Sequence, residues 1–220
     1  MLVKKIIAVL LFVPFFSLSY AQNGKSLTRS TPEAEGISAR VISIFIDSIN
    51  NSQDEFHSFM LLRHGKVIAE GWWNPYNRNL KHTLYSLSKS FTATAVGFAR
   101  AEGKLSISDK VISFFPGQLP DTMTAYLQQL TIKDLLTMSV GQEPDPTGLV
   151  VQDTNWIKKF LSLPIKHQPG SEFLYNSMAT YMLSAIVTKV TGEKVFDYLQ
   201  PRLFEPLGIT GIDWETDLKG

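Results

Sequence analysis

The 220-residue sequence contains no cysteine. This absence excludes disulfide bonds, a thiolate nucleophile and cysteine-ligated zinc sites. An excess of charge of one sign is lacking as well, because 21 lysines and arginines stand against 20 aspartates and glutamates, for a formal net charge of +1. A nearly neutral chain without blocks of like charge has no electrostatic footprint for nucleic acid. We therefore expect no nucleic-acid partner.

The spacing typical of metal ligands is also absent. None of the four histidines (His57, His64, His82 and His167) is spaced from another as zinc ligands are. We interpret each as a surface or packing residue and expect neither a metal nor another cofactor. A phosphate-binding loop and a G-x-S-x-G elbow are missing too. With 44% hydrophobic residues, the chain has enough apolar content for a globular core, and its length allows one large domain or two small ones.

The first residues have the pattern of a secretory signal. Lys4 and Lys5 form a short basic start, an apolar run covers residues 6–18, and Ser19 and Ala21 are the small residues that a signal peptidase reads. The apolar run is shorter than the roughly 20 residues that span a bilayer, and an uncleaved anchor is the alternative. We expect a signal peptide at 1–21, a mature domain at 22–220, and export to the periplasm or the medium.

Hydrophobic periodicity predicts an N-terminal helix, a hairpin and a mostly helical remainder. Ser38 is placed to cap a helix that ends near Ile49. Two strands are expected at 56–63 and 66–73, joined at His64-Gly65, because glycine allows the positive φ of a tight turn. A two-stranded hairpin is not stable alone, and no convincing strand follows it. We therefore expect the complete protein to have further strands.

The remainder is expected to contain five helices and one long loop. Thr131 has capping-box spacing to Asp134, which predicts a short helix there. The loop is expected over 141–148, where proline, glycine and aspartate are frequent. The helices are predicted at about 85–103, from Ser108, from Thr131, from about 177 to 192 and from about 195 to 204.

One motif has the composition of a nucleophile and its activating group. Ser86 and Lys89 are three residues apart at the start of an apolar helix, so they lie on the same face. A serine hydroxyl is a poor nucleophile until a neighbouring base takes its proton. The helix N-terminus and an apolar environment both disfavour a charged amine, which allows a lysine to act as that base. The pattern also arises by chance, and Lys89 would then be an ordinary solvated helix residue.

A second motif, Tyr175-Asn176-Ser177, begins the next long helix. A tyrosine beside a nucleophile relays protons when a cation stabilises its phenolate. Asn176 and Ser177 are candidates for binding substrate or orienting the lysine. A tyrosine at a helix start more often only packs, so the motif is weak alone.

Taken together, these stretches resemble the class C β-lactamase family in its broad sense, which includes penicillin-binding peptidases, esterases and 6-aminohexanoate-dimer hydrolases. They follow the family's order over nearly all of the chain after the signal. The stretches are Tyr-Ser-Leu-Ser-Lys-Ser-Phe-Thr at 85–92, Ala-Glu-Gly-Lys-Leu-Ser-Ile-Ser-Asp-Lys-Val at 101–111, Thr-Ile-Lys-Asp-Leu-Leu-Thr-Met at 131–138, Pro-Gly-Ser-Glu-Phe-Leu-Tyr-Asn-Ser at 169–177 and Pro-Arg-Leu-Phe-Glu-Pro-Leu-Gly-Ile at 201–209.

The resemblance implies an α/β fold, in which an antiparallel sheet flanked by helices is joined to a mostly helical subdomain. It implies that Ser86 forms an acyl-enzyme, that Lys89 activates it, and that Tyr175 acts with the lysine as general base and acid. The amide of Ser86 would supply half of the oxyanion hole. The implied substrate is a small ester or amide, including a β-lactam or a peptide, and no metal is needed.

Two departures from the family pattern leave alternatives open. The family usually has Tyr-x-Asn, whereas this chain has Ser177 at the third position, which puts β-lactam binding in doubt. The family's Lys/His-Thr/Ser-Gly triplet is not found after Tyr175, so we expect the sequence to be truncated before its last catalytic element and to be inactive as it stands. The alternatives are a non-catalytic penicillin- or peptidoglycan-binding homologue and an inactive fragment. Neither substrate nor oligomeric state follows from the sequence.

Overall fold

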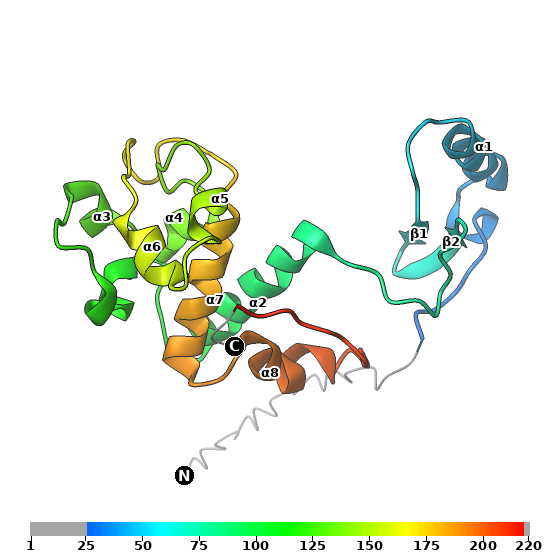
Figure 1. Cartoon of the computed structure of the whole chain (residues 1–220). Coiled ribbons are helices and arrows are strands. Elements are labelled where there is room, and N and C mark those ends of the chain that lie inside the picture. Colours follow the sequence, from blue (N-terminus) through cyan, green and yellow to red (C-terminus); the bar gives the residue numbers. More distant parts are fainter. Residues whose placement is uncertain (1–25, 218–220) are drawn as a thin grey trace, which may run out of the picture.

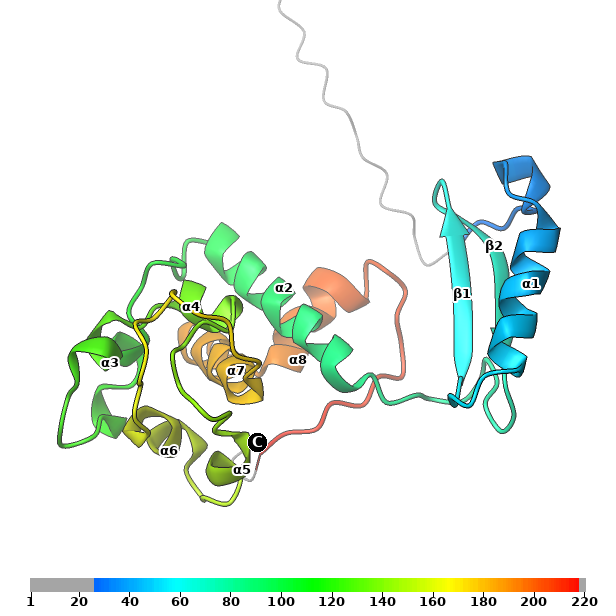
Figure 2. The ribbon, with the colours of Figure 1, turned by 90° about the horizontal axis from the view of Figure 1, so that it is seen from above.

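The structure is a computed structural model that describes residues 26–217 (Figure 1). The predicted signal peptide at 1–21 lies outside these residues. The described chain forms two parts that stand apart from each other, a hairpin covered by one helix and a larger body of helices (Figure 2). No helix in the described range is both long and apolar enough to cross a membrane.

The smaller part is built around an antiparallel hairpin. Strand β1 (Ser58–Arg63) pairs with β2 (Lys66–Trp72), with an irregularity between Leu61 and Leu62. The connecting residues His64 and Gly65 both have positive φ, 49° and 73°, which is the backbone of a tight hairpin turn. The two predicted strands and their turn are therefore confirmed, with ends within two residues of the predicted ones.

Helix α1 (Ala39–Asn50) covers one face of the hairpin (Figure 2). Its N-cap is Ser38, as predicted, since the serine side chain accepts a hydrogen bond from the Arg40 amide. Packing on the sheet includes an edge-on contact of Phe45 with Phe59 at 5.7 Å between ring centroids. In the described residues β1 pairs only with β2, and its Met60, Leu61 and Leu62 side chains are exposed.

The larger part consists of seven α-helices and several short turns. A single 3-10 turn, η2 (Tyr85–Leu87), leads into the first helix, and a π-helical turn over Gln200–Phe204 follows the last. Other 3-10 turns lie at Glu33–Glu35 in the smaller part and at Val111–Phe114 and Pro116–Gln118 here. The helices are α2 (Ser88–Ala101), α3 (Ala125–Gln129), α4 (Ile132–Leu136), α5 (Thr147–Val150), α6 (Trp156–Ser162), α7 (Ser177–Thr191) and α8 (Val195–Leu199).

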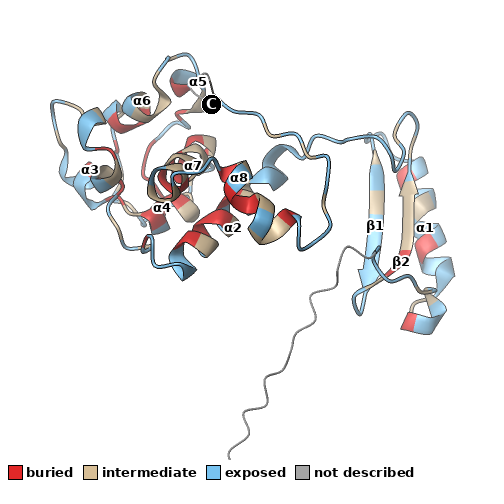
Figure 3. Cartoon of the chain, turned by 90° about the horizontal axis from the view of Figure 1, so that it is seen from below, coloured by how far each residue is buried: buried red, intermediate tan, exposed pale blue. Residues whose placement is uncertain are grey.

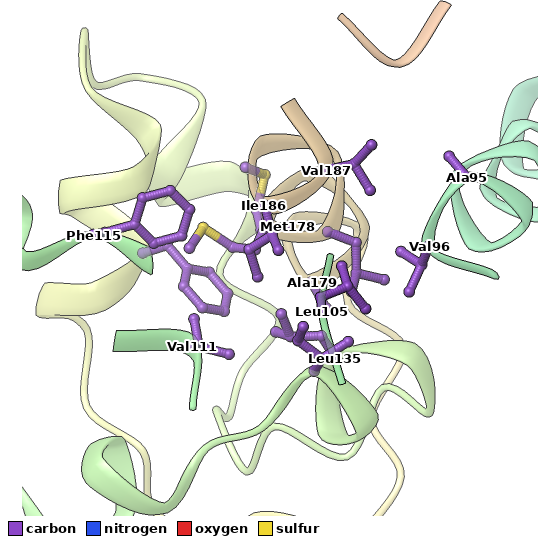
Figure 4. Packing of buried hydrophobic residues seen from close by; sticks show 14 of the residues in the cluster. Ala95, Val96, Leu105, Val111, Phe115, Leu135, Met178, Ala179, Ile186 and Val187 are labelled. Atoms are coloured by element: carbon purple, nitrogen blue, oxygen red, sulfur yellow. The ribbon is translucent and has the colours of Figure 1, made fainter. Parts of the chain in front are cut away.

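The core lies between α2, α4, α7 and α8, and most of the buried residues are in this body (Figure 3). Ala95 and Val96 of α2 lie on the side of that helix that faces Val187 of α7 (Figure 4). Because Ala95 has a small side chain and is fully buried, the two helix backbones can approach closely. The α2–α7 contact therefore fixes the relative position of the two helix starts, near which Ser86 and Tyr175 lie.

The helix ends follow the sequence signals in most places. Thr131 and Asp134 form both halves of the predicted capping box of α4. Gly192, with φ of 77°, ends α7 as predicted. The expected helix at 195–204 is α8 continued by the π-helical turn.

Three local predictions were wrong or incomplete. Ser108 does not begin a helix, because the Ser106 amide donates to the Asp109 carboxylate and closes a turn there instead. The first helical residue after this turn is Val111. The expected loop at 141–148 ends in α5, and helices α3 and α6 were not predicted. All three of these helices are at most seven residues long, too short for clear periodicity.

Candidate active site

Ser86 lies in the middle of η2, two residues before the first residue of α2, Ser88. The preceding residue, Tyr85, has a φ of 45°, which is rare for a residue with a side chain. The Ser88 hydroxyl donates to the Tyr85 carbonyl at 2.6 Å, and the Leu87 amide donates to the Leu84 carbonyl at 3.0 Å. These bonds hold a tight turn that leaves the Ser86 side chain exposed.

Lys89 lies one helical turn after Ser86, on the same face. Its Nζ donates a hydrogen bond to Ser86 Oγ at 3.2 Å. Their placement follows from the three-residue spacing at the helix start, so the sequence motif and the structure bring the same two groups together.

Tyr175, 89 residues further along the chain, contacts the same serine. Its hydroxyl lies 2.5 Å from Ser86 Oγ. Lys89 Nζ lies 4.9 Å from the centre of the tyrosine ring, within the range of a cation–π contact. The structure therefore brings the three predicted catalytic side chains together, with the serine hydroxyl between an amine and a phenol.

The electrostatics of this cluster favour the phenolate of Tyr175. The pKa of its hydroxyl is lowered below 10.0, first by the hydrogen bond with Lys89 and then by the one with Ser86. Burial opposes this shift, and the hydroxyl of Ser177 adds a smaller lowering effect. A phenol with a lowered pKa is a better acceptor for the Ser86 proton at neutral pH.

Backbone hydrogen bonds to the segment after α4 hold Tyr175 in place. The Leu174 amide donates to the Met138 carbonyl at 3.0 Å, and the Gly170 amide donates to the Ser139 carbonyl at 2.8 Å. Burial alternates along residues 173–176, since Leu174 and Asn176 are more buried than the residues beside them. Phe173 and Tyr175 are both exposed, as this alternation requires.

Asn176 caps α7 and is 1% exposed. Its Oδ1 accepts a hydrogen bond from the Ala179 amide at 3.0 Å, and its Nδ2 donates to Gln142 Oε1 at 3.2 Å. Gln142 is also buried, and its Nε2 donates to the Phe160 carbonyl at 3.1 Å. Both ends of the Asn176 amide are thus engaged within the protein beside Tyr175, and its role in substrate binding stays a prediction.

Ser177 is the first residue of α7 and is half-buried. Its hydroxyl contributes to lowering the pKa of Tyr175. Of the two predicted substrate-binding residues, Ser177 is thus the one that lies beside the cluster.

The loop that carries Gln142 depends on one glycine. Gly141 has a φ of 85°, and a Cβ there would lie 2.2 Å from the His167 carbonyl oxygen. The Gly141 carbonyl accepts hydrogen bonds from the amides of Lys166 and His167. His167 Nε2 lies 3.0 Å from Glu143 Oε2, and that carboxylate raises the pKa of the imidazole above 6.5.

Sequence reasoning missed Gln142 because nothing in a loop rich in proline and glycine marks one polar residue as buried. Its only signal is its position next to Gly141, at the start of that loop. Within residues 26–217, no group of three histidine, aspartate or glutamate side chains is placed to hold a metal ion.

Comparison with known proteins gives a consistent picture. The family model described as Beta-lactamase matches residues 57–220. An Escherichia coli (strain K12) protein described as "Putative D-alanyl-D-alanine carboxypeptidase" is 25% identical over 224 residues, covering 88% of this chain and 52% of its own length. The chain thus spans about half the length of the curated relatives that it matches.

Solved structures agree on the fold. A Beta-Lactamase/D-Alanine Carboxypeptidase from Pseudomonas syringae matches with a TM-score of 0.59 at 23% identity, over 76% of this chain and 48% of that one. A "Putative 6-aminohexanoate-dimer hydrolase" from Bacillus anthracis matches with a TM-score of 0.60 at 19% identity, over 76% of this chain and 47% of that one. The predicted resemblance and the predicted α/β fold class are both confirmed.

Proposed function

Because the chain belongs to the beta-lactamase family, we propose that its protein is a serine hydrolase that cleaves an ester or amide bond through an acyl-serine intermediate. The observation that carries this proposal is the position of Ser86 Oγ, 3.2 Å from Lys89 Nζ and 2.5 Å from the Tyr175 hydroxyl. Covalent catalysis requires a nucleophile within hydrogen-bonding reach of a base. A further group orients that base or shifts its pKa.

In the proposed mechanism Tyr175 is the proton acceptor and Lys89 is its electrostatic partner. The phenolate of Tyr175 takes the proton of Ser86 Oγ as the serine oxygen attacks the carbonyl carbon of the substrate. Tyr175 then returns that proton to the leaving amine or alkoxide, and the acyl-serine forms. Water, deprotonated by Tyr175, attacks the acyl carbonyl, and Ser86 leaves with the proton that Tyr175 returns.

The ammonium of Lys89 stabilises the phenolate in each step, in line with the lowered pKa of Tyr175. The backbone amide of Ser86 lies at the start of α2, where amide dipoles favour negative charge, and we assign it to the developing oxyanion. Ser177 is proposed to contact substrate or the phenolate. Asn176 is proposed to act indirectly, by fixing the start of α7.

The proposed substrate class is a small amide, ester or peptide, on which the family acts in general. The descriptions of similar proteins include "Putative D-alanyl-D-alanine carboxypeptidase" and "Putative 6-aminohexanoate-dimer hydrolase", and the proposed acyl-serine mechanism serves amides and esters alike. We also propose export of residues 22–220, based on the signal pattern at 1–21. Fractionation of cells that express the tagged protein tests this, and retention of the uncleaved chain in the cytoplasm would contradict it.

The experiment that tests the catalytic proposal is covalent labelling with a fluorophosphonate probe. The protein that contains this sequence should gain one adduct, which peptide mass spectrometry should locate on Ser86. Ser86→Ala should abolish labelling, while Ser90→Ala, which changes an exposed serine at the third position of α2, should label normally. An adduct on another serine, or equal labelling of Ser86→Ala, would exclude this mechanism.

A further inference from the structure

Two buried amide side chains, Gln142 and Asn176, lie next to the proposed proton acceptor Tyr175. Gln142 is 3% exposed and Asn176 is 1% exposed, and they come from segments that are 34 residues apart. Burying an amide costs free energy unless its polar atoms are hydrogen-bonded. Three hydrogen bonds meet this requirement, and together they join the start of α7 to α6.

The backbone groups at the two ends of this chain of hydrogen bonds determine how both amides are oriented. The Ala179 N–H can only donate, so the Asn176 Oδ1 faces it, at 3.0 Å. The Asn176 Nδ2 therefore points to Gln142 and donates to its Oε1 at 3.2 Å. The remaining Gln142 Nε2 donates at 3.1 Å to the Phe160 carbonyl, which can only accept. Reversing either amide would place two donors or two acceptors against each other.

The position of Tyr175 depends on the residues on either side of it, because its own side chain is exposed. The preceding residue is held by the Leu174 amide, which donates to the Met138 carbonyl at 3.0 Å. The following residue, Asn176, is held by Gln142. Met138 and Gln142 are only four positions apart in the sequence, so one short segment holds the chain on both sides of Tyr175.

We propose that Gln142 is a positioning residue of the proposed hydrolase, which fixes Asn176 and thereby holds the Tyr175 hydroxyl at Ser86. The proposal rests on the proposed function, because it gives Gln142 an effect on the proton transfer between Tyr175 and Ser86. In the part of the chain that the structure describes, the Gln142 side chain is hydrogen-bonded to Asn176 and Phe160 and not to the reacting atoms. Gln142 therefore acts through its neighbours.

The hydrogen bond with Gln142 differs in kind from the one with Ala179. The bond between Asn176 and Ala179 lies within the first turn of α7 and moves with that helix. The bond with Gln142 instead joins α7 to a side chain that is anchored on the carbonyl of Phe160, a residue of α6 that is 1% exposed. Because a close-packed core resists displacement, Gln142 gives the residue after Tyr175 a fixed reference.

A small displacement of Tyr175 should lower the rate, because the proposed proton transfer depends on its 2.5 Å contact with Ser86 Oγ. Misplacing a reacting group by about 1 Å can cost about 10²-fold in rate. Without the Gln142 bond, Tyr175 should move by less than this, since Leu174 is still held by Met138. We therefore expect a loss of about 10-fold.

The test removes the link from each side in turn. Gln142→Met keeps a side chain of similar length but has no amide. Asn176→Ser keeps a good helix N-cap but has no amide to donate to Gln142, and the double variant combines the two changes. Gln128→Met, at an exposed position of α3, is the matched control and should behave as wild type. Circular dichroism and urea unfolding establish that each variant is folded.

Each single variant should lower kcat on a nitrophenyl ester about 10-fold, which corresponds to about 1.4 kcal/mol, with KM changed less than kcat. The double variant should lose no more than the worse single variant, because both changes remove the same link. The alkaline rise of kcat/KM should also move to higher pH, since a displaced Tyr175 loses part of its hydrogen bond with Lys89.

An unchanged kcat and pH profile in either folded single variant would overturn the proposal. So would losses that multiply in the double variant, because these would mean two independent structural effects. If Gln142→Met does not fold, Asn176→Ser alone decides the matter, since its helix cap is retained.

Labelling separates this inference from the proposed function. A fluorophosphonate adduct on Ser86 that forms about 10-fold more slowly in Gln142→Met than in wild type would support both. An adduct on Ser86 that forms at the wild-type rate in both single variants would overturn the role of Gln142 and leave the proposed function standing. The absence of an adduct on Ser86 in the wild-type protein would refute the proposed function and, with it, the role of Gln142.

Discussion

Replacing Lys89 by alanine is the most informative perturbation of the proposed site. The change removes the donor that lies 3.2 Å from Ser86 Oγ and the cation that lies 4.9 Å from the Tyr175 ring. It also removes the largest cause of the lowered Tyr175 pKa, the hydrogen bond with Lys89. The nucleophile and its proton acceptor remain, but the acceptor becomes an ordinary phenol.

The expected loss follows from these contacts. A positioned acid–base group contributes about 10² to 10⁴ in rate, so kcat/KM should fall by at least about 100-fold at neutral pH, or about 2.7 kcal/mol. Because the variant's Tyr175 pKa rises, its phenolate forms only at higher pH. The alkaline rise of kcat/KM should therefore move to higher pH, and the loss should be smaller in alkaline solution than at pH 7.

The assay is the pH dependence of kcat/KM on a short-chain nitrophenyl ester, with fluorophosphonate labelling as a second readout. Lys158→Ala, which changes an exposed lysine of α6, is the matched control and should behave as wild type. Tyr175→Phe should lose activity without an alkaline recovery. A near-wild-type rate for Lys89→Ala at pH 7, or a loss with no displacement of the pH profile, would refute the assignment of the two roles.

Three further outcomes are expected. Gly141→Ala should lower the free energy of unfolding, measured in urea, by about 2 kcal/mol or more, because the added Cβ would clash with the His167 carbonyl and the backbone has a positive φ. Gly148→Ala is the control and should leave stability unchanged, since no atom lies within 4 Å of its added Cβ. Asn176→Ala should lower the free energy of unfolding by about 1 to 3 kcal/mol, since it removes a helix cap and the hydrogen-bond donor to the buried Gln142 Oε1. An unchanged stability in urea would contradict this. The hydrogen bond with Glu143 raises the pKa of His167, so the protonated imidazole stabilises the fold fully below about pH 6.5, and this stabilisation is lost as the pH rises through the pKa of the folded state. Glu143→Gln should therefore reduce the pH dependence of the free energy of unfolding, and an unchanged dependence would argue against the contact.

Local signals account for the parts of the fold that were predicted correctly. The hairpin turn needs two residues with positive φ, and His64-Gly65 supplies them. The capping box of α4 is encoded by the spacing of Thr131 and Asp134. The pairing of Ser86 with Lys89 likewise depends on spacing within one helical turn. Each of these features is decided by residues within a few positions of each other.

The rest of the site depends on contacts between distant segments, which no local pattern encodes. Tyr175 was placed beside Ser86 only through the family resemblance. Asn176 stands next to that tyrosine, and its amide donates a hydrogen bond to Gln142, 34 residues away, which no local pattern predicts.

The placement of the parts suggests a division of labour within the proposed enzyme. Ser86 lies in η2 just before α2, Lys89 lies in the first turn of α2, and Tyr175 precedes α7. The two helices pack on each other, and buried residues such as Ala95 and Val187 belong to their shared core. The proton-transfer geometry is therefore set inside the helical body, where packing is dense and displacements are costly. Strands β1 and β2 contribute none of these three side chains, so substitutions in the hairpin should leave the contacts of Ser86 with Lys89 and Tyr175 unchanged.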